Sequence, residues 1–332
     1  MNECGIGLVL GSQNAPEDIA ALARLGESSG FDELWIAEDY FFTGGVACAA
    51  AALAATERVP VGLGVVSAMV RHPAVLAMEC SSLARMFPGR LRPGIGLGLP
   101  AWVQQMGLYP RSQLTAVREC VEALRELLDG GTVDRHGTSF AFDEVQLAYP
   151  VTPPVPIFTG ALGPRMMELS GSIADGTIGS IFASVEYVRW ARELIAAGRA
   201  AAGRTGHHPF ACFAICCVDD NGEQARAALR PVMAFYLSVL AESPLIEVYG
   251  IREELGSLLT DGVDRLAAEM PDRWLDDLAV TGDPDECARQ IRRLMDAGAD
   301  SVALFPLPAE RSEAIIRLAA QEVVPRVRRL ST

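Results

Sequence analysis

Four residues able to do acid–base chemistry follow two short apolar runs of this chain. Glu38, Asp39 and Tyr40 come directly after ELWIA, and His72 comes shortly after VGLGVV. Carboxyl, phenol and imidazole groups can each hold or release a proton at a reacting atom. A structural interpretation stands beside the catalytic one. The acid pair can cap a helix with aromatic packing nearby, and a His-Pro pair before a helix can be a capped turn.

Glycines interrupt the two runs that follow. Gly62 and Gly64 lie among the valines of VGLGVV, and Gly96 and Gly98 belong to GIGLG. Glycine inside a strand marks a bulge or a close backbone approach by a ligand. The second run lacks the G-x-G-x-x-G spacing of a dinucleotide loop, so it favours a flat backbone floor under a planar ligand.

A small-residue turn, TGALGPR, runs from Thr159 into a predicted helix that begins at Pro164. The free N–H groups and the dipole of a helix N-terminus favour an anion such as phosphate, and Arg165 adds a positive charge. Gly179 and Ser180 end the next apolar run and are expected beside this turn. An ordinary connection between a strand and a helix remains the alternative.

The elements that must position these residues alternate between strand and helix. Eight short apolar runs are predicted as strands, each followed by a helical pattern: IGLVL, ELWIA, VPVGLGVV, LRPGIGLG, VPIFTG, GTIGS, FACFAICCVD and SVALFP. Such a rhythm predicts a parallel sheet covered by helices, and the count of eight favours a closed (β/α)₈ TIM barrel. GTVDRHGTSFAF is predicted as a hairpin. Helical segments without a strand, about 221–277, predict an insertion in one domain that spans 1–332.

Composition excludes several classes of protein. The net charge of −14 argues against a duplex nucleic-acid partner, which needs a basic face. All 28 basic residues are arginine, so Schiff-base and P-loop lysine chemistry is absent. The histidines show no metal-ligand spacing, and no G-x-S-x-G turn of a hydrolase occurs.

The expected location is the cytoplasm. The eight cysteines are scattered without a C-x-x-C pair, which predicts reduced and mostly buried thiols. The first residues have no basic region like that of a signal peptide, and GGVACAAAALAA is too short to span a bilayer. We therefore expect a soluble protein without a membrane segment.

Four stretches in the same order resemble the bacterial luciferase-like superfamily: GFDELWIAEDYF, VGLGVVSAMVRHPAVLAMECSSLARMFPGRLRPGIGLG, PIFTGALGPRMMELSGSIADG and VTGDPDECARQIRRLMDAGADSVALFP. They cover nearly the whole chain. Within that superfamily the sequence looks most like the branch of methylenetetrahydromethanopterin reductase-like oxidoreductases, which use the deazaflavin coenzyme F-420. The resemblance implies a (β/α)₈ barrel with an insertion before the last βα units, and a homodimer.

The resemblance also implies where the coenzyme lies. A bulge at the end of the third strand backs the central ring, often through a non-proline cis peptide, which here is the bond between Gly64 and Val65. The phosphate falls on the turn after the fifth strand. Together with the arguments above, this gives the candidate cofactor-binding residues Gly64, Val65, Val66, Ser67, Gly96, Gly98, Thr159, Gly160, Ala161, Leu162, Gly163, Arg165, Gly179 and Ser180.

One position departs from the pattern. Several relatives carry a glutamate as proton donor just after the glycine run, where this chain has Leu99. The candidate catalytic residues are therefore Glu38, Asp39, Tyr40 and His72. The expected function is hydride transfer between C5 of the deazaflavin and a small organic substrate. An FMN-dependent monooxygenase or flavin reductase, and a barrel that binds a cofactor without catalysis, are the alternatives.

Overall fold

Parallel strands form a closed barrel in the computed structural model, which describes residues 5–11 and 13–330. Eight strand positions make up the barrel wall: β1 (Gly5–Leu10), β2 (Glu33–Ile36), β3 (Val61–Leu63) with β4 (Val66–Ser67), β5 (Leu91–Arg92) with β6 (Gly94–Gly96), β9 (Phe158–Gly160), β10 (Gly176–Gly179), β11 (Phe210–Val218) and β13 (Ser301–Pro306). Strand β1 pairs with both β13 and β2, and the sheet closes because β3 pairs with β5 and β4 with β6. The predicted (β/α)₈ barrel is confirmed.

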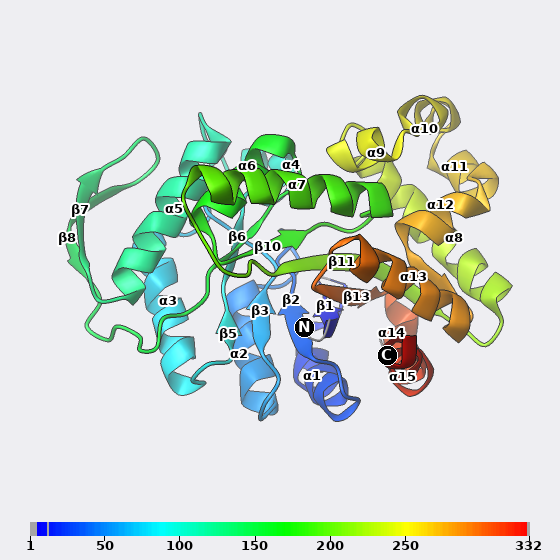
Figure 1. Ribbon diagram of the computed structural model, residues 1–332, viewed down its shortest axis with the longest axis horizontal. Helices are drawn as coiled ribbons and strands as arrows, with labels where there is room; N and C mark the ends of the chain where they lie inside the picture. Colours follow the sequence, from blue (N-terminus) through cyan, green and yellow to red (C-terminus); the bar gives the residue numbers. More distant parts are fainter. Residues whose placement is uncertain (1–4, 12, 331–332) are drawn as a thin grey trace.

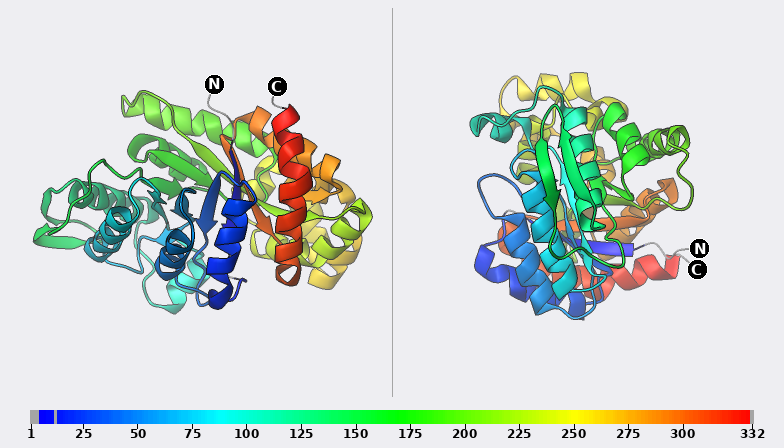
Figure 2. Two further views of the ribbon diagram at one scale, coloured as in Figure 1. Left: turned by 90° about the horizontal axis from the view of Figure 1, so that it is seen from below. Right: turned by 90° about the vertical axis from the view of Figure 1, so that its left-hand side faces the viewer.

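Helices form the outer layer around this barrel (Figure 1). They are α1 (Ile19–Ser28), α2 (Gly45–Ala55), α3 (Pro73–Met86), α5 (Gln113–Leu128), α6 (Pro164–Ile173), α7 (Val185–Ala201), α13 (Pro284–Ala297), and the closing run α14 (Ser312–Leu318), η3 (Ala319–Val323) and α15 (Val324–Leu330). Polar side chains at Ser112, Ser184 and Asp283 cap three of them by accepting a backbone N–H from the first turn. The closing run lies beside α1, which completes the layer (Figure 2).

Helices also fill the segment that was predicted as an insertion. They are α8 (Gly222–Val239), α9 (Pro244–Tyr249), α10 (Arg252–Leu259), α11 (Val263–Glu269) and α12 (Asp272–Leu278). In Figure 1 they form the yellow-green to golden group at one end of the molecule. That the chain is one domain remains a prediction.

Two further elements leave the barrel. The predicted hairpin is present as β7 (Thr132–His136) and β8 (Ala141–Gln146), which pair antiparallel. A short strand that the sequence did not predict, β12 (Val280–Gly282), pairs with the end of β11. It joins the insertion to the barrel wall.

Bulky rings fill the barrel interior. Trp35 is completely buried and contacts the rings of Phe158 and Phe213, at centroid distances of 5.5 and 5.7 Å. Its indole N–H donates to Glu33 at 2.9 Å, and Glu33 in turn forms an ion pair with Arg92. The indole N–H therefore has a hydrogen-bond acceptor inside the barrel.

Three findings bear on the classes considered above. Among residues 5–11 and 13–330, no helix is long and apolar enough to cross a membrane. In the same described part of the chain, no group of three His, Cys, Asp or Glu side chains is placed to hold a metal ion. The seven described cysteines are free and buried, and Cys4 lies outside the described residues.

Candidate active site

A cavity of about 890 Å³ opens at the carboxyl ends of the strands. Its walls come from the loop after β2, the break between β3 and β4, the segments after β6, β9 and β10, and the insertion. The lining residues are Glu38, Asp39, Gly64, Val65, Gly96, Leu97, Gly98, Leu99, Pro100, Tyr109, Pro110, Arg111, Ser112, Gln113, Leu114, Gly160, Ala161, Leu162, Gly163, Pro164, Arg165, Met166, Ile178, Gly179, Ser180, Phe213, Leu240 and Pro244. A volume of this size accommodates a tricyclic ring system and a small substrate.

The floor of the cavity is a bulge between β3 and β4. The peptide bond between Gly64 and Val65 is cis, as the resemblance implied. A second non-proline cis bond, between Tyr40 and Phe41, was not expected. The third strand position pairs with the fourth on both sides of the bulge, β3 with β5 and β4 with β6, and the bulge interrupts this pairing. Val65 is thereby presented to the cavity.

Val65 sits in a notch made by two glycines of neighbouring strands. A Cβ added to Gly96 would lie 2.6 Å from Val65 Cγ2, and one added to Gly160 would lie 2.8 Å from Val65 Cγ1. Both distances are shorter than real contacts allow, so these positions need glycine for Val65 to keep its place. We call Gly96 and Gly160 the Val65 notch.

Gly62 and Gly64 make room for aromatic rings of the protein itself, whereas a floor at Gly96 and Gly98, which line the cavity, stays a prediction. A Cβ at Gly62 would meet the Trp35 ring at 2.2 Å, and one at Gly64 would meet Phe213 at 2.6 Å. These glycines admit the rings of Trp35 from the neighbouring β2 and of Phe213 from β11 across the barrel. The nearby ligand-facing surface is made by Val65 and Phe213, both of which line the cavity.

Glu38 is fixed by four hydrogen bonds. Its Oε1 accepts from Tyr40 at 2.9 Å and from Arg71 at 2.7 Å. Its Oε2 accepts from a second nitrogen of Arg71 at 2.7 Å and from the backbone N–H of Gly45 at 2.7 Å. The side chain is 2 % exposed. A carboxylate engaged in this way anchors the loop after β2 rather than delivering a proton.

Tyr40 is held by the same network. Its hydroxyl donates to Glu38 and accepts from the backbone N–H of Ser67 at 3.4 Å. Burial and the neighbouring charge of Glu38 raise the pKa of this phenol well above its usual value. The hydroxyl proton points at Glu38, and Tyr40 does not line the cavity.

His72 lies outside the cavity. Its Nδ1 accepts from the backbone N–H of Ala74 at 3.2 Å, which caps α3. Its ring packs against Phe140 and Phe142 of the hairpin region, with centroids 5.8 and 4.8 Å away. The structural interpretation of His72 fits this geometry, and the catalytic one does not.

Three candidate cofactor-binding residues face away from the cavity. Val66 and Ser67 are buried and do not line it, and Ser67 Oγ accepts from the N–H of Met69 at 3.1 Å. The hydroxyl of Thr159 donates to Ser170 of α6 at 2.6 Å. We expected contact with the coenzyme because these residues adjoin the bulge and the turn. Their side chains are instead buried against other parts of the protein.

The chain of hydroxyls behind Thr159 ends at a buried histidine. Ser170 and Thr177 are 2.6 Å apart, and Thr177 is 2.8 Å from Nε2 of His208. Nδ1 of His208 accepts from Arg199 at 3.1 Å, so Nε2 carries the proton and donates to Thr177. Burial first, and then nearby arginines, lower the pKa of His208 to about 4.

The other predicted residues come together around the start of α6. Gly160, Ala161, Leu162 and Gly163 line the cavity with Arg165, and Gly179 and Ser180 line it from β10. Gly163 is the N-cap of α6 and offers no side-chain acceptor to the first turn. Pro164 has no N–H, and the N–H groups of Met166 and Met167 donate to the carbonyl of Gly163, so the donors open to an anion are those of Gly163 and Arg165, with the positive end of the helix dipole behind them.

The buried Tyr187 holds this turn from below, since its hydroxyl donates to the carbonyl of Leu162 at 2.7 Å. Sequence reasoning missed this contact because Tyr187 follows the next strand and lies in α7.

An acid that lines the cavity, Asp39, has a phenolic neighbour, Tyr236, which does not line it. Asp39 is half-buried and lines it, close enough to raise the pKa of Tyr236 in α8, although burial is the larger cause. Gln13 donates to the Tyr236 hydroxyl at 3.1 Å. Sequence reasoning missed Tyr236 and Phe213, since neither directly follows a strand.

The comparisons with known proteins agree with this geometry. The profile of the luciferase-like monooxygenase family matches residues 5–301. The 5,10-methylenetetrahydromethanopterin reductase of Methanolobus tindarius is 28% identical over 333 residues, which cover 96% of this chain and 100% of that protein. The F-420-dependent glucose-6-phosphate dehydrogenase of Nakamurella multipartita is 30% identical, with 96% and 94% covered. The solved coenzyme F-420-dependent tetrahydromethanopterin reductase of Methanopyrus kandleri superposes with a TM-score of 0.86 at 25% identity, covering 98% and 99%.

Proposed function

This chain belongs to the luciferase-like monooxygenase family, and from that premise we propose that it is a coenzyme F-420-dependent oxidoreductase acting on a small organic molecule. The observation that carries the proposal is that one cavity contains both the Val65 bulge and the open N-terminus of α6. A planar ring needs the first of these and a phosphate needs the second.

The residues present fit the coenzyme. The bulge offers an apolar platform formed by Val65 and Phe213, and the turn 160–163 offers backbone donors without a competing side chain. Arg165 adds a cation to the same wall. When bound, the deazaflavin supplies a ring carbon, C5, that gives or accepts a hydride.

The protein itself contributes positioning and a proton. Glu38 accepts hydrogen bonds from both Tyr40 and Arg71, so these residues hold the loop that carries Asp39. Leu99 lines the cavity without a titratable group. We assign Asp39 as the group that exchanges a proton with the substrate, since it is the cavity-lining acid beside Glu38 and faces the Tyr236 side.

The FMN-dependent alternative has less support. Two of the three relatives described above carry F-420 dependence in their names, and the alternatives from the sequence gain no separate observation in the cavity. A cytoplasmic location and a homodimer remain proposals, and the buried free thiols support a reducing compartment.

The first experiment is a titration of the purified protein with coenzyme F-420 and with FMN, followed by fluorescence. We expect F-420 to bind in the micromolar range and FMN much more weakly. Preference for FMN would contradict the proposal and point to oxygen chemistry. Binding of neither would remove the cofactor site itself.

The role of Asp39 is tested by Asp39→Asn. We expect turnover to fall roughly a hundredfold while coenzyme affinity stays unchanged, because the amide keeps the shape and loses the acid. The matched control is Asp18→Asn, an exposed aspartate that makes no side-chain cap contact at the start of α1. Equal turnover in both variants would show that Asp39 is not the proton donor.

A further inference from the structure

Two arginine side chains of the cavity wall have no partner among the residues that the structure describes. Arg111 and Arg165 both line the cavity and both are exposed. Neither makes a hydrogen bond, an ion pair or a ring contact with any residue in 5–11 or 13–330. The side chains of four other arginines in these ranges also make no such contact: Arg24, Arg58, Arg189 and Arg289. All four are exposed and none lines the cavity, and Arg58 and Arg289 lie within electrostatic reach of Glu27 and Glu286.

Two unpaired arginine side chains at one cavity are unusual in so acidic a chain. The sequence has 42 acidic residues for 28 arginines, and most arginines pair with them. Examples are Arg226 with Asp276 and Glu286, and Arg326 with Asp285. An unpaired guanidinium is therefore not the default here. That the cavity holds two indicates a place kept free for an anion that is not part of the protein.

The two arginines lie at the starts of neighbouring helices. Arg111 precedes α5 by two residues, and Arg165 is the second residue of α6. Helices α5 and α6 pack against each other in the outer layer (Figure 1). Both begin on the side of the barrel where the strands end, so the two guanidinium groups belong to the same rim of the cavity.

The first anion at this rim is already assigned, because the turn 160–163 offers backbone donors for one phosphate. Two arginines beyond it exceed what that phosphate needs. Arginine binds carboxylates through paired N–H donors in a planar fork. The ligand chemistry that fits is a flexible chain carrying several carboxylates, joined to the phosphate.

Resting on the proposed function, we infer that Arg111 and Arg165 bind the oligoglutamate tail of coenzyme F-420. The tail follows the phosphate in that coenzyme, whereas FMN ends at its phosphate. The two arginines therefore contribute to the choice of F-420 over FMN. They also overcome locally the repulsion that a chain of net charge −14 exerts on an acidic ligand.

The test uses Arg111→Gln and Arg165→Gln with three forms of the coenzyme: without glutamate, with a short tail and with a long tail. Dissociation constants are measured by fluorescence at low and high salt. We expect each substitution to weaken long-tail binding about two- to fivefold, since exposed charge pairs contribute this much, and to reduce its salt dependence. For Arg111→Gln, binding of the form without glutamate stays close to wild type, and for Arg165→Gln it weakens less than binding of the long-tail form.

The matched control is Arg189→Gln, which removes an unpaired, exposed arginine of α7 outside the cavity and leaves all three affinities unchanged. Equal weakening for all three forms would overturn the inference and assign the arginines to the phosphate. A change only in the Michaelis constant of an anionic substrate would also overturn it. A wild-type protein that binds no form of F-420 would instead refute the proposed function.

Discussion

The barrel wall has an interrupted part and a continuous part, and the two differ in how much they contribute to the cavity. The interrupted part consists of β3 with β4, β5 with β6, and β9, in pieces of two or three residues. The continuous part consists of β11, β13 and β1, with nine, six and six residues, and β11 is buried throughout. The cavity floor comes mainly from the interrupted part. The continuous part sends only the Phe213 side chain of β11 to the cavity, whereas regular pairing is interrupted where the backbone presents Val65.

This difference predicts that changes in the interrupted part alter ligand binding, whereas changes near the continuous part alter stability alone. Four substitutions or conditions test it, in order of decreasing effect.

The largest effect is expected from Glu38→Gln, in the loop that borders the interrupted part. The substitution leaves Arg71, whose side chain is 20% exposed, with only Glu79 as a charged partner at 3.3 Å. Breaking a buried pair on one side costs about 3–5 kcal/mol, and we expect a loss of roughly 2–4 kcal/mol in the free energy of unfolding, together with weaker coenzyme binding. Urea denaturation measures the loss.

Its control is Glu313→Gln, which removes an exposed ion pair with Arg317 in α14. That loss should be below about 0.5 kcal/mol. If the two variants lose the same stability, Glu38 does not anchor the loop.

The next largest effect tests the Val65 notch. Gly96→Ala places a Cβ against Val65 Cγ2 and pushes that side chain toward the cavity. Overpacking of this kind costs about 1–3 kcal/mol, and we expect coenzyme affinity to fall about tenfold. The double variant Gly96→Ala with Val65→Ala should recover most of the affinity. No recovery would mean that the notch does not act through Val65.

A smaller effect, on stability alone, concerns His208 behind the wall between β10 and β11. Its pKa is lowered to about 4, whereas an unfolded chain takes up this proton near pH 6.5. Full stability is therefore present above about pH 6.5 and is lost as the pH falls toward about 4. Between about pH 6.5 and 5 we expect a loss of about 1–2 kcal/mol in the free energy of unfolding.

The measurement is the slope of unfolding free energy against pH for wild type and His208→Gln. The variant should show a flatter slope, while His136→Gln, an exposed histidine of the hairpin, keeps the wild-type slope. Coenzyme affinity should not follow the His208 titration. A His208→Gln slope equal to that of wild type would contradict the assignment.

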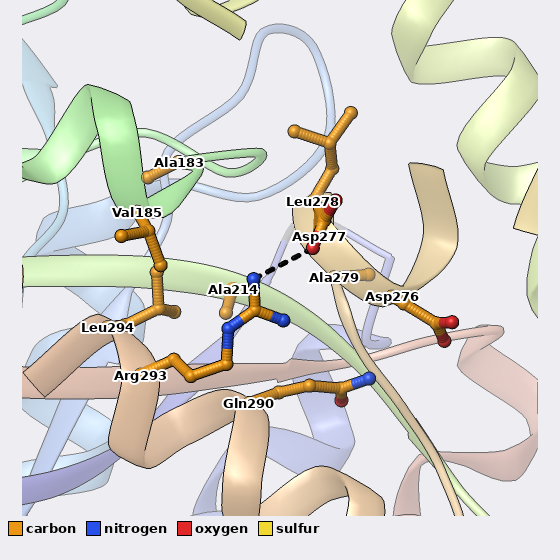
Figure 3. A pocket seen from close by; sticks show the side chains of 10 residues that line it. All are labelled: Ala183, Val185, Ala214, Asp276, Asp277, Leu278, Ala279, Gln290, Arg293 and Leu294. Atoms are coloured by element: carbon orange, nitrogen blue, oxygen red, sulfur yellow. Dashed lines mark hydrogen bonds and ion pairs between the residues drawn. The ribbon is translucent and has the colours of Figure 1, made fainter. Parts of the chain in front are cut away.

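The smallest effect is expected at a second, much smaller hollow, of about 10 Å³, between α7, α12 and α13. There Arg293 forms an ion pair with Asp277 at 2.9 Å (Figure 3). Arg293→Gln should cost less than about 1 kcal/mol, because the pair is partly exposed. Coenzyme affinity measured by fluorescence should be unchanged, and a clear loss would show that this hollow communicates with the cavity.

The barrel could be predicted from the sequence because buried parallel strands read as continuous apolar runs, such as FACFAICCV in β11. Interruptions were harder to see. LRPGIGLG was predicted as one strand, but it forms β5 and β6, and the three residues of β12 were too few to stand out beside the insertion. Short strands are defined by their partners, which a single sequence does not display.

The position of the site could be predicted from the sequence, but the roles of its individual residues could not. Segments that follow parallel strands converge at one end of a barrel, so the turn 160–163 and Asp39 were placed correctly at the cavity. The roles of Glu38 and His72 depend on partners far along the chain, Arg71 for the first and the hairpin for the second. Such contacts become visible only once distances are known.

The pairing of glycines with bulky neighbours has an evolutionary consequence. The absence of a side chain makes room for Trp35 at Gly62, for Phe213 at Gly64, and for Val65 at the notch glycines. Each pair spans different strands, so neither member can change size alone without a clash or a void. Drift at these positions must proceed through compensating double substitutions. In an alignment of relatives, the size of the residue at each glycine position should vary inversely with the size of its partner.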